Sequence, residues 1–320
     1  MVRFHTMAKN SLSIIIVNWN GMQFLPPCLV EISRNLELSD YEVFVVDNVS
    51  TDGSREWLNS DEANEIFPPG RLKVILSDKN IGFARANNKA IEHANGDLIF
   101  ILNPDTIVQP GAVEQLTEVL VSDDRIGAVS PKLLNPDGSL QESIADFASN
   151  PVSILYRGLH LSRPYDHTKL GKVPVFWGTA ILAKRKMIEE IGAFDPDFFM
   201  YGEDVEWCVR MNRNGWQTVF VPDAEVVHLG GRSSEQAWKA SETSLRKEAA
   251  DLLVQKKCLP AYLVGLNSIT KAGLYSAAYL RRWLTGEPRD FLSKHIRLHF
   301  NECKSSLLAV LSVDRNNKAK

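Results

Sequence analysis

The sequence predicts an α/β protein in which helices flank a mostly parallel central sheet. Between residues 12 and 102, short apolar runs alternate four times with helical patterns. Wholly apolar runs of this length are typical of strands buried on both faces. Three successive runs end on a loop that carries Asp or Asn. Open α/β sheets bind ligands beyond the carboxyl ends of their strands, so we expect a ligand site where these loops meet.

The order of the expected elements supports this fold class. Apolar runs predict the first four strands at Leu12–Val17, Tyr41–Val46, Lys73–Leu76 and Leu98–Leu102. Amphipathic patterns predict helices at about Leu25–Leu36, from the Asp78–Lys89 segment to about Ala94, and at about Gly111–Val121. Further along, we expect an apolar segment at Ala128–Ser130, strands at Val173–Leu182 and Thr218–Val221, and a helix at Arg185–Ile191.

Residues 140–172 have little periodicity and contain several Gly and Pro residues. Two interpretations stay open for this segment, a mobile substrate loop and an excursion toward a membrane. Apolar residues among basic ones, at Ile154–Tyr156 and Leu159–Leu161, suggest the second interpretation.

The composition is that of a soluble globular protein, with 44% hydrophobic and 23% charged residues in a chain of 320. The four cysteines, which form no Cys-x-x-Cys pair, are Cys28, Cys208, Cys258 and Cys303. The sequence therefore suggests neither a zinc site nor a disulfide framework, and a reducing cytosol is the simplest location. The first apolar run ends too early for a signal peptide. No stretch has the roughly 18–20 uninterrupted apolar residues of a membrane-spanning helix.

Charge is unevenly distributed along the chain. The net charge is −3, but the segment from Leu280 onward has nine basic and four acidic residues, or +5, which leaves −8 for the rest. A basic tail on an acidic body indicates an anionic partner, and a membrane surface fits better than nucleic acid. We expect one domain at residues 1–235 and a helical, basic extension at 236–320. Within the extension, Ala261–Leu280 is either a packed helix or an interfacial one.

The most informative strand end is Asn103-Pro104-Asp105. Pro104 cannot donate to a strand ladder, so we expect Asp105 at the carboxyl tip of a buried strand. A carboxylate beside an amide suits a hard divalent cation whose other ligands are phosphate oxygens. Asn-Pro-Asp is also ordinary turn chemistry, and these residues alone leave both interpretations open.

A second block surrounds Glu203 and Asp204 with aromatic and apolar residues ahead of a helix. Such surroundings partly desolvate a carboxylate and raise its basicity toward that of a general base. The alternative is structural: Asp204 caps the helix, while Glu206 and Arg210 form a surface ion pair one helical turn apart. One loop can serve both purposes.

His228 follows an apolar strand and heads a Gly-Gly-Arg-Ser loop. A single histidine in such a place is commonly structural. Neutral imidazole could also give a metal ion a nitrogen ligand that the oxygen-rich Asp105 side lacks. The following loop offers backbone amides and a cation to an anion.

The loop after the first strand excludes two classes of nucleotide-binding enzyme. Gly21 is the only glycine among residues 18–24, so the Gly-x-Gly-x-x-Gly loop of a dinucleotide-dependent dehydrogenase is absent. A nucleotidylyltransferase would need a loop rich in Gly and Arg, and the same residues contain no arginine.

Taken together, seven segments resemble family-two glycosyltransferases with the GT-A fold, and they span roughly residues 11–235. They are Ser13–Asn20, Val46–Ser54, Asn80–Asn88, Leu102–Thr106, Trp177–Ala180, Gly202–Trp207 and His228–Gly231. The resemblance implies a Rossmann-like sheet and makes residues 1–235 the catalytic domain. The Asn-Pro-Asp and His-x-Gly-Gly segments look most like bacterial rhamnosyltransferases that act on cell-surface polysaccharides.

The resemblance also implies a role for each matching residue. Asp204 would be the catalytic base with Glu203 as its neighbour in the motif. Asp105 would be the metal-binding carboxylate, with His228 as a second ligand. The residues expected to border the nucleotide sugar are Asn18, Asp47, Asn48, Asp52, Asp78, Asn80, Gly82, Asn87, Asn103 and Asp105.

The implied reaction is glycosyl transfer with inversion in a single displacement. Asp204 would take the proton from an acceptor hydroxyl, and Mg²⁺ or Mn²⁺ at Asp105 would offset the charge on the departing diphosphate. The expected donor is a nucleotide sugar, with dTDP-rhamnose the best match. The expected acceptor is a glycan or a polyprenyl-phosphate-linked glycan beside Trp177 and Gly178, at the cytoplasmic face of the inner membrane.

Asn103 is a departure from the family pattern. Many relatives have Asp there, so the usual Asp-x-Asp is reduced to Asn-x-Asp in this chain. The departure implies weaker metal binding. It keeps open the alternative of a non-catalytic protein that binds a nucleotide sugar. Independently of Asn103, a UDP-sugar-dependent transferase of the same fold is the other alternative.

Overall fold

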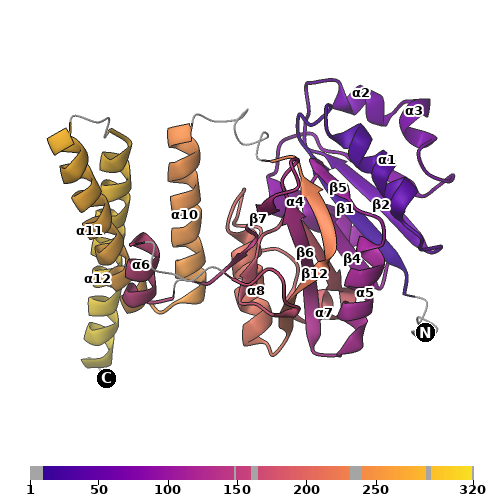
Figure 1. The fold of residues 1–320 in the computed structure, drawn as a ribbon. Coiled ribbons are helices and arrows are strands. Elements are labelled where there is room, and N and C mark those ends of the chain that lie inside the picture. Colours follow the sequence, from indigo (N-terminus) through magenta and orange to yellow (C-terminus); the bar gives the residue numbers. More distant parts are fainter. Residues whose placement is uncertain (1–9, 148, 160–164, 231–239, 286–289, 319–320) are drawn as a thin grey trace. The chain divides into compact units, whose positions relative to one another are not determined.

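The computed structural model describes residues 10–147, 149–159, 165–230, 240–285 and 290–318 (Figure 1). The chain forms two compact units. The first contains Met1–Asp146 and Tyr165–Ser233, and the second contains Phe147–Pro164 and Ser234–Lys320. The second unit therefore takes a segment from the middle of the chain as well as the C-terminal region.

The first four strands form a parallel half-sheet, as predicted. They are β1 (Leu12–Asn18), β2 (Tyr41–Asp47), β3 (Leu72–Leu76) and β4 (Leu98–Leu102), in the order β3-β2-β1-β4. Every residue of β1 and β4 is buried, which explains why apolar side chains occupy both faces of these strands. Because all four run in one direction, their polar carboxyl ends lie at one edge of the sheet.

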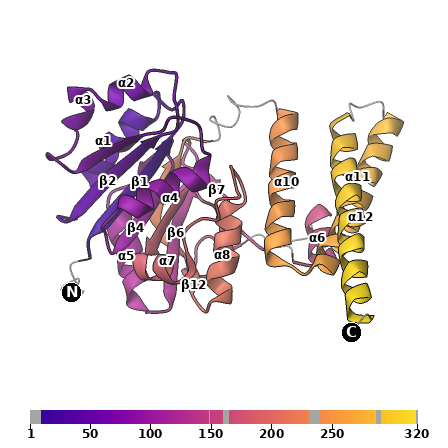
Figure 2. The same ribbon diagram turned by 180° about the vertical axis from the view of Figure 1, so that it is seen from behind.

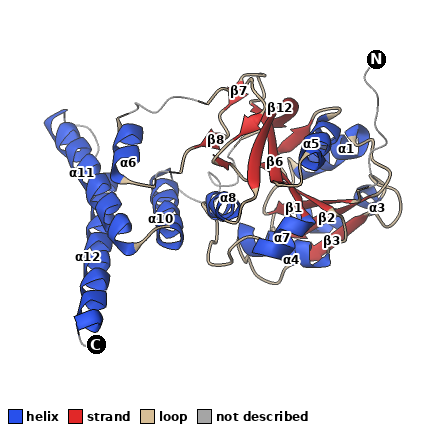
Figure 3. Ribbon diagram, turned by 90° about the horizontal axis from the view of Figure 1, so that it is seen from below, coloured by secondary structure: helices blue, strands red, loops and turns tan. Residues whose placement is uncertain are grey.

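Helices cover both faces of this sheet (Figure 3). On one face, α1 and α5 bury leucines in the main core, together with the short helices α2 and α3. On the other face lie α4 and α7, and α4 presents the small buried side chains Ala84, Ala86 and Ala90. The bounds are α1 (Leu25–Asn35), α2 (Ser54–Leu58), α3 (Asp61–Asn64), α4 (Phe83–His93), α5 (Ala112–Ser122) and α7 (Arg185–Ile191).

The second half of the sheet is mixed. β11 runs antiparallel to both β4 and β6, β12 runs parallel to β6, and β5 is antiparallel to β12 at the end of the path. The short strands β7 and β9 pair with β6 and β12. The bounds are β5 (Thr106–Val108), β6 (Ile126–Leu134), β7 (Leu140–Gln141), β9 (Gly171–Lys172), β11 (Ala180–Lys184) and β12 (Gln217–His228).

The prediction of one strand at Val173–Leu182 was wrong. This segment contains β10 (Val175–Phe176), which pairs with β8 (Ile144–Ala145) in a separate small sheet, and the first half of β11 in the central sheet. The change of partner occurs at Trp177, whose backbone N–H donates to the carbonyl of Ser143 (2.9 Å). An apolar run does not reveal such a change, because both strands are buried.

The strand expected at Thr218–Val221 is longer than predicted. β12 continues to His228, and its register shifts between Val221 and Glu225. Pro222 lies in this irregular stretch, where its missing N–H breaks no ladder bond. His228 is therefore the last residue of a strand, and it pairs with Thr106 of β5.

The second unit is helical and contains α6 (Pro151–Gly158), α10 (Ala240–Cys258), α11 (Ala261–Thr285) and α12 (Asp290–Lys318). α11 and α12 lie side by side (Figures 1 and 2). α6 comes from the segment with little periodicity, and it approaches α11 so closely that a Cβ on Gly158 would lie 2.5 Å from Leu274. Among the described residues, no helix combines the length and apolarity needed to span a membrane.

A buried ionic cluster joins three helices of this unit. Glu248 of α10 accepts hydrogen bonds from Lys271 Nζ (2.6 Å) and Tyr275 Oη (2.5 Å) of α11, and His299 Nε2 of α12 lies 2.9 Å away. Lys271 also pairs with Asp251. Burial raises the pKa of Glu248, but His299 and Lys271 outweigh it and hold the pKa below its usual range.

Candidate active site

Polar side chains from the ends of β1 and β2 form a buried group. Asn18 Nδ2 donates to Ser50 Oγ (3.1 Å) and lies 3.4 Å from Asp47 Oδ2, while the Ser50 N–H donates to Asp47 Oδ1 (3.2 Å). Asn18 and Asp47 are fully buried, and Asn18 Oδ1 has no hydrogen-bond partner among the described residues. An orphaned buried acceptor is unfavourable, so this oxygen is suited to accept from a ligand or a water molecule.

Asn48 ties the end of β2 to the loop after β3. Its Nδ2 donates to Asn80 Oδ1 (2.8 Å), and its Oδ1 accepts from the N–H of Ile81 (2.9 Å). Gly82 follows with φ +83°, and a Cβ there would lie 2.3 Å from the carbonyl oxygen of Phe199. Only glycine fits this position, where the loop after β3 meets the loop that precedes α8 (Glu203–Arg213).

Three other predicted residues have different environments. Asn87 is buried, and its Oδ1 has no partner within the described part of the chain. Asp52 accepts from Ser54 Oγ (2.5 Å) and from the N–H of Met22 (2.8 Å), so both of its oxygens hold neighbouring loops. Asp78 is exposed in the turn after β3. The structure thus buries Asn87 in α4, where its Nδ2 donates to the Phe83 carbonyl (3.0 Å), and leaves Asp78 exposed.

Asp105 and His228 lie together, where β5 and β12 pair. Asp105 is 5% exposed, and its Oδ1 is 3.4 Å from His228 Nε2. The N–H of Leu229 donates to the Asp105 carbonyl (2.8 Å). The described residues contain no cluster of three or more His, Cys, Asp or Glu placed to hold a metal ion. The predicted Gly-Gly-Arg-Ser loop lies, from Gly231 on, outside the described residues.

The two carboxylates at the start of α8 differ in their contacts. Asp204 Oδ2 accepts from the N–H of Gly178 (2.7 Å), and its Oδ1 accepts from the N–H of Val205 (2.8 Å). Glu203 is 5% exposed, and its Oε2 has no partner among the residues described. Gly202, rather than Asp204, occupies the N-cap position. The helix start therefore leaves Asp204 free to bind the Gly178 loop.

Burial makes this pair of carboxylates basic. Burial, and then the negative charge of Asp204, raise the pKa of Glu203 to about 8. Burial also raises the pKa of Asp204, although the hydrogen bonds from Gly178 and Val205 oppose the shift. At neutral pH, Glu203 is therefore mostly protonated, and Asp204 beside it is more basic than an exposed aspartate.

The ion pair expected on the surface of α8 is largely buried. Arg210 binds Glu206 through Nε (2.9 Å) and Nη2 (2.8 Å), and it also donates to the carbonyls of Ile191 (2.6 Å), Gly192 (3.1 Å) and Ala193 (2.8 Å). This arginine therefore holds the loop between α7 and α8, which positions the start of α8.

Hydrogen bonds connect the acidic pair to the end of β4. The N–H of Asn103 donates to the carbonyl of Thr179 (2.9 Å). Thr179 follows Gly178, which binds Asp204. Only Pro104 lies between Asn103 and Asp105, so short links join the predicted base to the predicted metal carboxylate. Trp177, predicted on the acceptor side, is 44% exposed next to these links.

Sequence reasoning missed three residues that support the site. Asn88 Nδ2 donates to the Phe194 carbonyl (2.7 Å), and Arg85 Nε donates to the Pro196 carbonyl (2.8 Å), so α4 holds the loop that leads to α8. Their spacing of three residues on one helix face was the available signal. Gln141, whose Oε1 lies 2.6 Å from His228 Nδ1, gave no signal, because it lies in the segment without periodicity.

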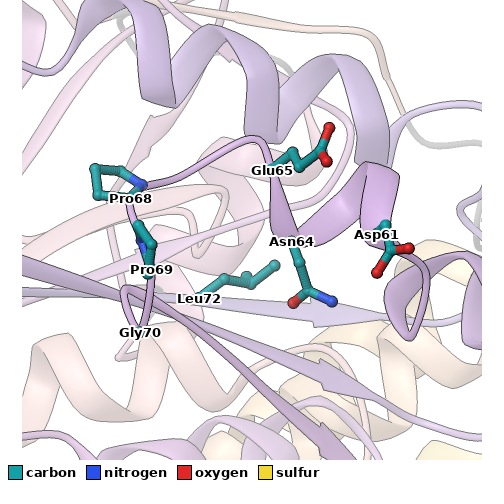
Figure 4. A pocket seen from close by; sticks show the side chains of 7 residues that line it. All are labelled: Asp61, Asn64, Glu65, Pro68, Pro69, Gly70 and Leu72. Atoms are coloured by element: carbon teal, nitrogen blue, oxygen red, sulfur yellow. The ribbon is translucent and has the colours of Figure 1, made fainter.

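A separate hollow lies at the opposite edge of the sheet (Figure 4). It is lined by Asp61, Asn64, Glu65, Pro68, Pro69, Gly70 and Leu72. β3 begins at Leu72, so this hollow adjoins the amino end of a strand, whereas the predicted site residues follow the carboxyl ends. It is not part of the candidate site.

Comparison with known proteins connects this geometry to an enzyme family. Residues 13–192 match the family model described as glycosyl transferase family 2. An N-acetylglucosaminyl-diphospho-decaprenol L-rhamnosyltransferase of Mycobacterium tuberculosis is 28% identical over 249 residues, which cover 70% of this chain and 77% of the relative. The low-salt glycan biosynthesis hexosyltransferase Agl10 of Haloferax volcanii is 28% identical over 211 residues, 64% of this chain and 62% of its own.

Solved structures show the same fold. The mannosyltransferase PcManGT of Pyrobaculum calidifontis, in complex with GDP-Man and Mn²⁺, has a TM-score of 0.56 at 18% identity and covers 92% of this chain and 88% of its own. GalNAc-T7 with UDP, GalNAc and Mn²⁺ has a TM-score of 0.62 at 17% identity over 94% of this chain and 57% of its own. The GT-A fold predicted from the sequence is therefore confirmed.

Proposed function

Because the chain belongs to glycosyl transferase family 2, we propose that it moves a sugar from a nucleotide-sugar donor to a hydroxyl of a lipid-linked or polysaccharide glycan, with inversion in one displacement. The observation that carries the proposal is the environment of Asp204. This carboxylate is held by the backbone of Gly178 and Val205, and burial raises its pKa.

Asp204 is suited to act as the base. Each of its oxygens accepts one backbone hydrogen bond, which leaves a lone pair for the proton of an acceptor hydroxyl. Its neighbour Glu203 is neutral at pH 7, because its pKa is about 8. Asp204 therefore has no second negative charge beside it at this pH, and its raised pKa strengthens it as a proton acceptor.

Asp105 and His228 fit a divalent cation. Their facing atoms are 3.4 Å apart, which is too long for a strong hydrogen bond and close enough for both side chains to hold one ion. A carboxylate and an imidazole also form a donor set that Mn²⁺ accepts. When bound, Mg²⁺ or Mn²⁺ would offset the charge that develops on the departing diphosphate. Asn103 supplies no second carboxylate, so we expect weaker metal binding than at an Asp-x-Asp site.

The buried group at the ends of β1 and β2 is suited to the nucleoside. The unpartnered Oδ1 of Asn18 is an acceptor for a base or ribose donor. Asp47, fully buried beside it, accepts from Ser50 and, more weakly, from Asn18, and its Oδ1 lies 4.0 Å from Arg55 Nη1. Asn48 and Asn80 brace the next loop, and Gly82 keeps that loop against Phe199. The acceptor would approach from the side of Trp177 and Gly178.

The donor and acceptor classes rest on similarity. The rhamnosyltransferase relative at 28% identity, together with Asn-Pro-Asp and His-x-Gly-Gly in this chain, favours L-rhamnose from dTDP-rhamnose and a polyprenyl-linked acceptor. A UDP-sugar donor is the main alternative, and a nucleotide-sugar-binding protein without transfer activity is the second, which Asn103 keeps open.

The second unit offers a surface for peripheral contact with the membrane that carries such an acceptor. On α11, exposed apolar side chains lie three to four residues apart near its start and again near its end, where two arginines adjoin them, as in an interfacial helix. The exposed residues are Tyr262, Leu266, Ile269, Leu280 and Trp283, and the arginines are Arg281 and Arg282. Flotation with vesicles that contain anionic lipid tests this contact, and a protein that stays at the bottom of the gradient argues against it.

A donor panel tests the proposed function. Thermal-shift measurements with UDP-, dTDP- and GDP-sugars, with and without Mn²⁺, should show the largest stabilisation by dTDP-rhamnose with Mn²⁺. The preferred donor should then transfer its sugar to a polyprenyl-diphosphate glycan, with the opposite anomeric configuration in the product. A preference for a UDP-sugar overturns the rhamnose assignment. Binding without transfer to any acceptor supports the non-catalytic alternative.

The metal role has its own variant. Asp105→Asn should weaken Mn²⁺ binding at least about tenfold, because a buried carboxylate ligand becomes a neutral amide. Electron paramagnetic resonance of free Mn²⁺ measures this affinity directly. Unchanged Mn²⁺ affinity in the folded variant would exclude Asp105 as the metal ligand.

A further inference from the structure

A hydrogen bond outside the predicted site controls how His228 faces Asp105. His228 Nδ1 lies 2.6 Å from Gln141 Oε1, and His228 Nε2 faces Asp105 Oδ1 at 3.4 Å. A neutral imidazole carries its proton on one nitrogen and a lone pair on the other, and the partner of one nitrogen determines the state of the other. The orientation of the Gln141 amide therefore decides which nitrogen can bind a metal ion.

The orientation of that amide follows from its other contacts. Gln141 Nε2 donates to Asn135 Oδ1 (3.1 Å). Asn135 in turn donates through Nδ2 to Ser139 Oγ (2.9 Å) and lies within reach of the Leu140 carbonyl (3.4 Å). An amide nitrogen is only a donor. With Asn135 in this orientation, its oxygen faces Gln141 and must accept from the Gln141 amide nitrogen. The amide oxygen of Gln141 must then face His228.

Asp137 determines the direction of the whole chain of hydrogen bonds. The hydroxyl of Ser139 donates to Asp137 Oδ1 (2.6 Å), and the Ser139 N–H donates to the same oxygen (2.9 Å). These bonds hold the pKa of Asp137 below its usual range, so its carboxylate is ionised and accepts only. The Ser139 hydroxyl must then accept from Asn135 Nδ2, and every later bond in the series has one possible direction.

The sheet holds the two ends of this series in place. Gln141 of β7 pairs with Leu133 of β6, and Leu133 pairs with Val226 of β12, two residues before His228. At the end of β12, His228 pairs with Thr106, next to Asp105. Backbone ladders therefore set the positions of Gln141, His228 and Asp105, and the hydrogen-bond series sets the proton on the imidazole.

We propose that Gln141 is a positioning residue that keeps His228 in the Nδ1–H tautomer, so that the Nε2 lone pair faces Asp105 and the two residues bind one divalent cation. This inference rests on the metal role in the proposed function and extends it to a partner that gave no signal in the sequence. Metal-binding histidines commonly donate their second N–H in this way, and loss of the partner weakens metal binding by about 10–100-fold.

Two variants of Gln141 separate positioning from packing. Gln141→Leu keeps the approximate volume but removes the acceptor for Nδ1–H, whereas Gln141→Glu keeps an acceptor oxygen. Gln109→Leu is a matched control, because the side-chain amide of Gln109 contacts only the Ile107 carbonyl, at 3.5 Å, among the contacts that the structure describes. Thermal unfolding and circular dichroism establish that each variant is folded.

The first readout is the tautomer of His228 without metal. In ¹⁵N-histidine spectra at pH 8, with the His228 signals assigned by their absence in His228→Asn, the wild type and Gln141→Glu should show the Nδ1–H form. Gln141→Leu should lose that preference. A Gln141→Leu protein that keeps the Nδ1–H tautomer overturns the proposal.

The second readout is Mn²⁺ affinity, measured by electron paramagnetic resonance with the nucleoside diphosphate present. We expect Gln141→Leu to bind Mn²⁺ at least about tenfold more weakly than the wild type, with Gln141→Glu and Gln109→Leu near the wild type. Equal Mn²⁺ affinity in Gln141→Leu and the wild type overturns the proposed role of Gln141 but leaves the metal role of Asp105 and His228 unaffected. A wild-type protein that binds no Mn²⁺ overturns the metal role itself, which is a different result.

Discussion

Replacing Glu203 with Gln should stabilise the protein at neutral pH. Glu203 is 5% exposed, and burial raises its pKa from 4.5 to about 8. Between these two pH values the folded protein keeps the proton that the unfolded chain releases, so stability falls as pH rises through this window. Gln does not titrate, so the stability of the variant does not fall for this reason as pH rises.

The size of the effect follows from the same two values. Within this window, each rise of one pH unit lowers the free energy of unfolding of the wild type by at most about 1.4 kcal/mol, because one proton is involved. At pH 7 the free energy of unfolding of Glu203→Gln should therefore exceed that of the wild type by up to about 3 kcal/mol. This difference should vanish below pH 4.5. For a domain of this size, about 1 kcal/mol shifts Tm by roughly 2–4 °C, so the expected gain is several degrees.

Differential scanning calorimetry from pH 4 to 8.5 measures the difference in Tm between variant and wild type. Glu206→Gln is the matched control, because Glu206 lies on the same helix but is paired with Arg210 at 2.8 Å. That substitution should destabilise the protein by about 1–3 kcal/mol at pH 7. A Glu203→Gln protein whose Tm matches the wild type at every pH would show that burial does not keep Glu203 protonated in the folded protein.

Two further predictions concern the scaffold. Gly82→Ala should destabilise the protein by more than about 2 kcal/mol, because the new Cβ would lie 2.3 Å from the carbonyl oxygen of Phe199. Gly138→Ala is the control, because Gly138 has a similar φ of +81° but no atom of the described residues within 4 Å of a Cβ placed there. This control substitution should destabilise the protein by only about 1 kcal/mol. Urea unfolding compares the two, and equal costs would contradict the close contact. Lys271→Met should destabilise the helical unit by about 3 kcal/mol, because it removes the buried cation of Glu248. Circular dichroism at 222 nm during thermal unfolding follows this change, and an unaltered transition would show that the pair contributes little.

The parts of the fold that follow from local pattern could be predicted from the sequence. Leu98–Leu102 is a fully buried strand as expected, because a short apolar run ended by Pro has few other stable arrangements. α7 spans Arg185–Ile191 as predicted. The strand ends that carry Asp47 and Asn103 lie at one edge of the sheet, because parallel strands share an edge.

The parts that depend on distant partners could not be predicted. Val173–Leu182 divides between two sheets, with the change at Trp177, whose N–H donates to the Ser143 carbonyl. An apolar run in the sequence does not show which strand it pairs with. Gln141 contacts His228 across 87 positions of sequence, which no local pattern reveals. The basicity of Glu203 depends on how completely the surrounding aromatic residues bury it, and only the folded chain shows that.

Turnover by Asp204→Asn, with the preferred donor and acceptor, tests directly whether Asp204 is the base of a sugar transfer. We expect transfer to fall by at least about 10²-fold, while donor affinity, measured by calorimetry in the same preparation, stays within about twofold. Asp124→Asn, on an exposed loop, should keep full activity. An Asp204→Asn protein that binds the donor and transfers sugar at the wild-type rate would show that Asp204 is not the base.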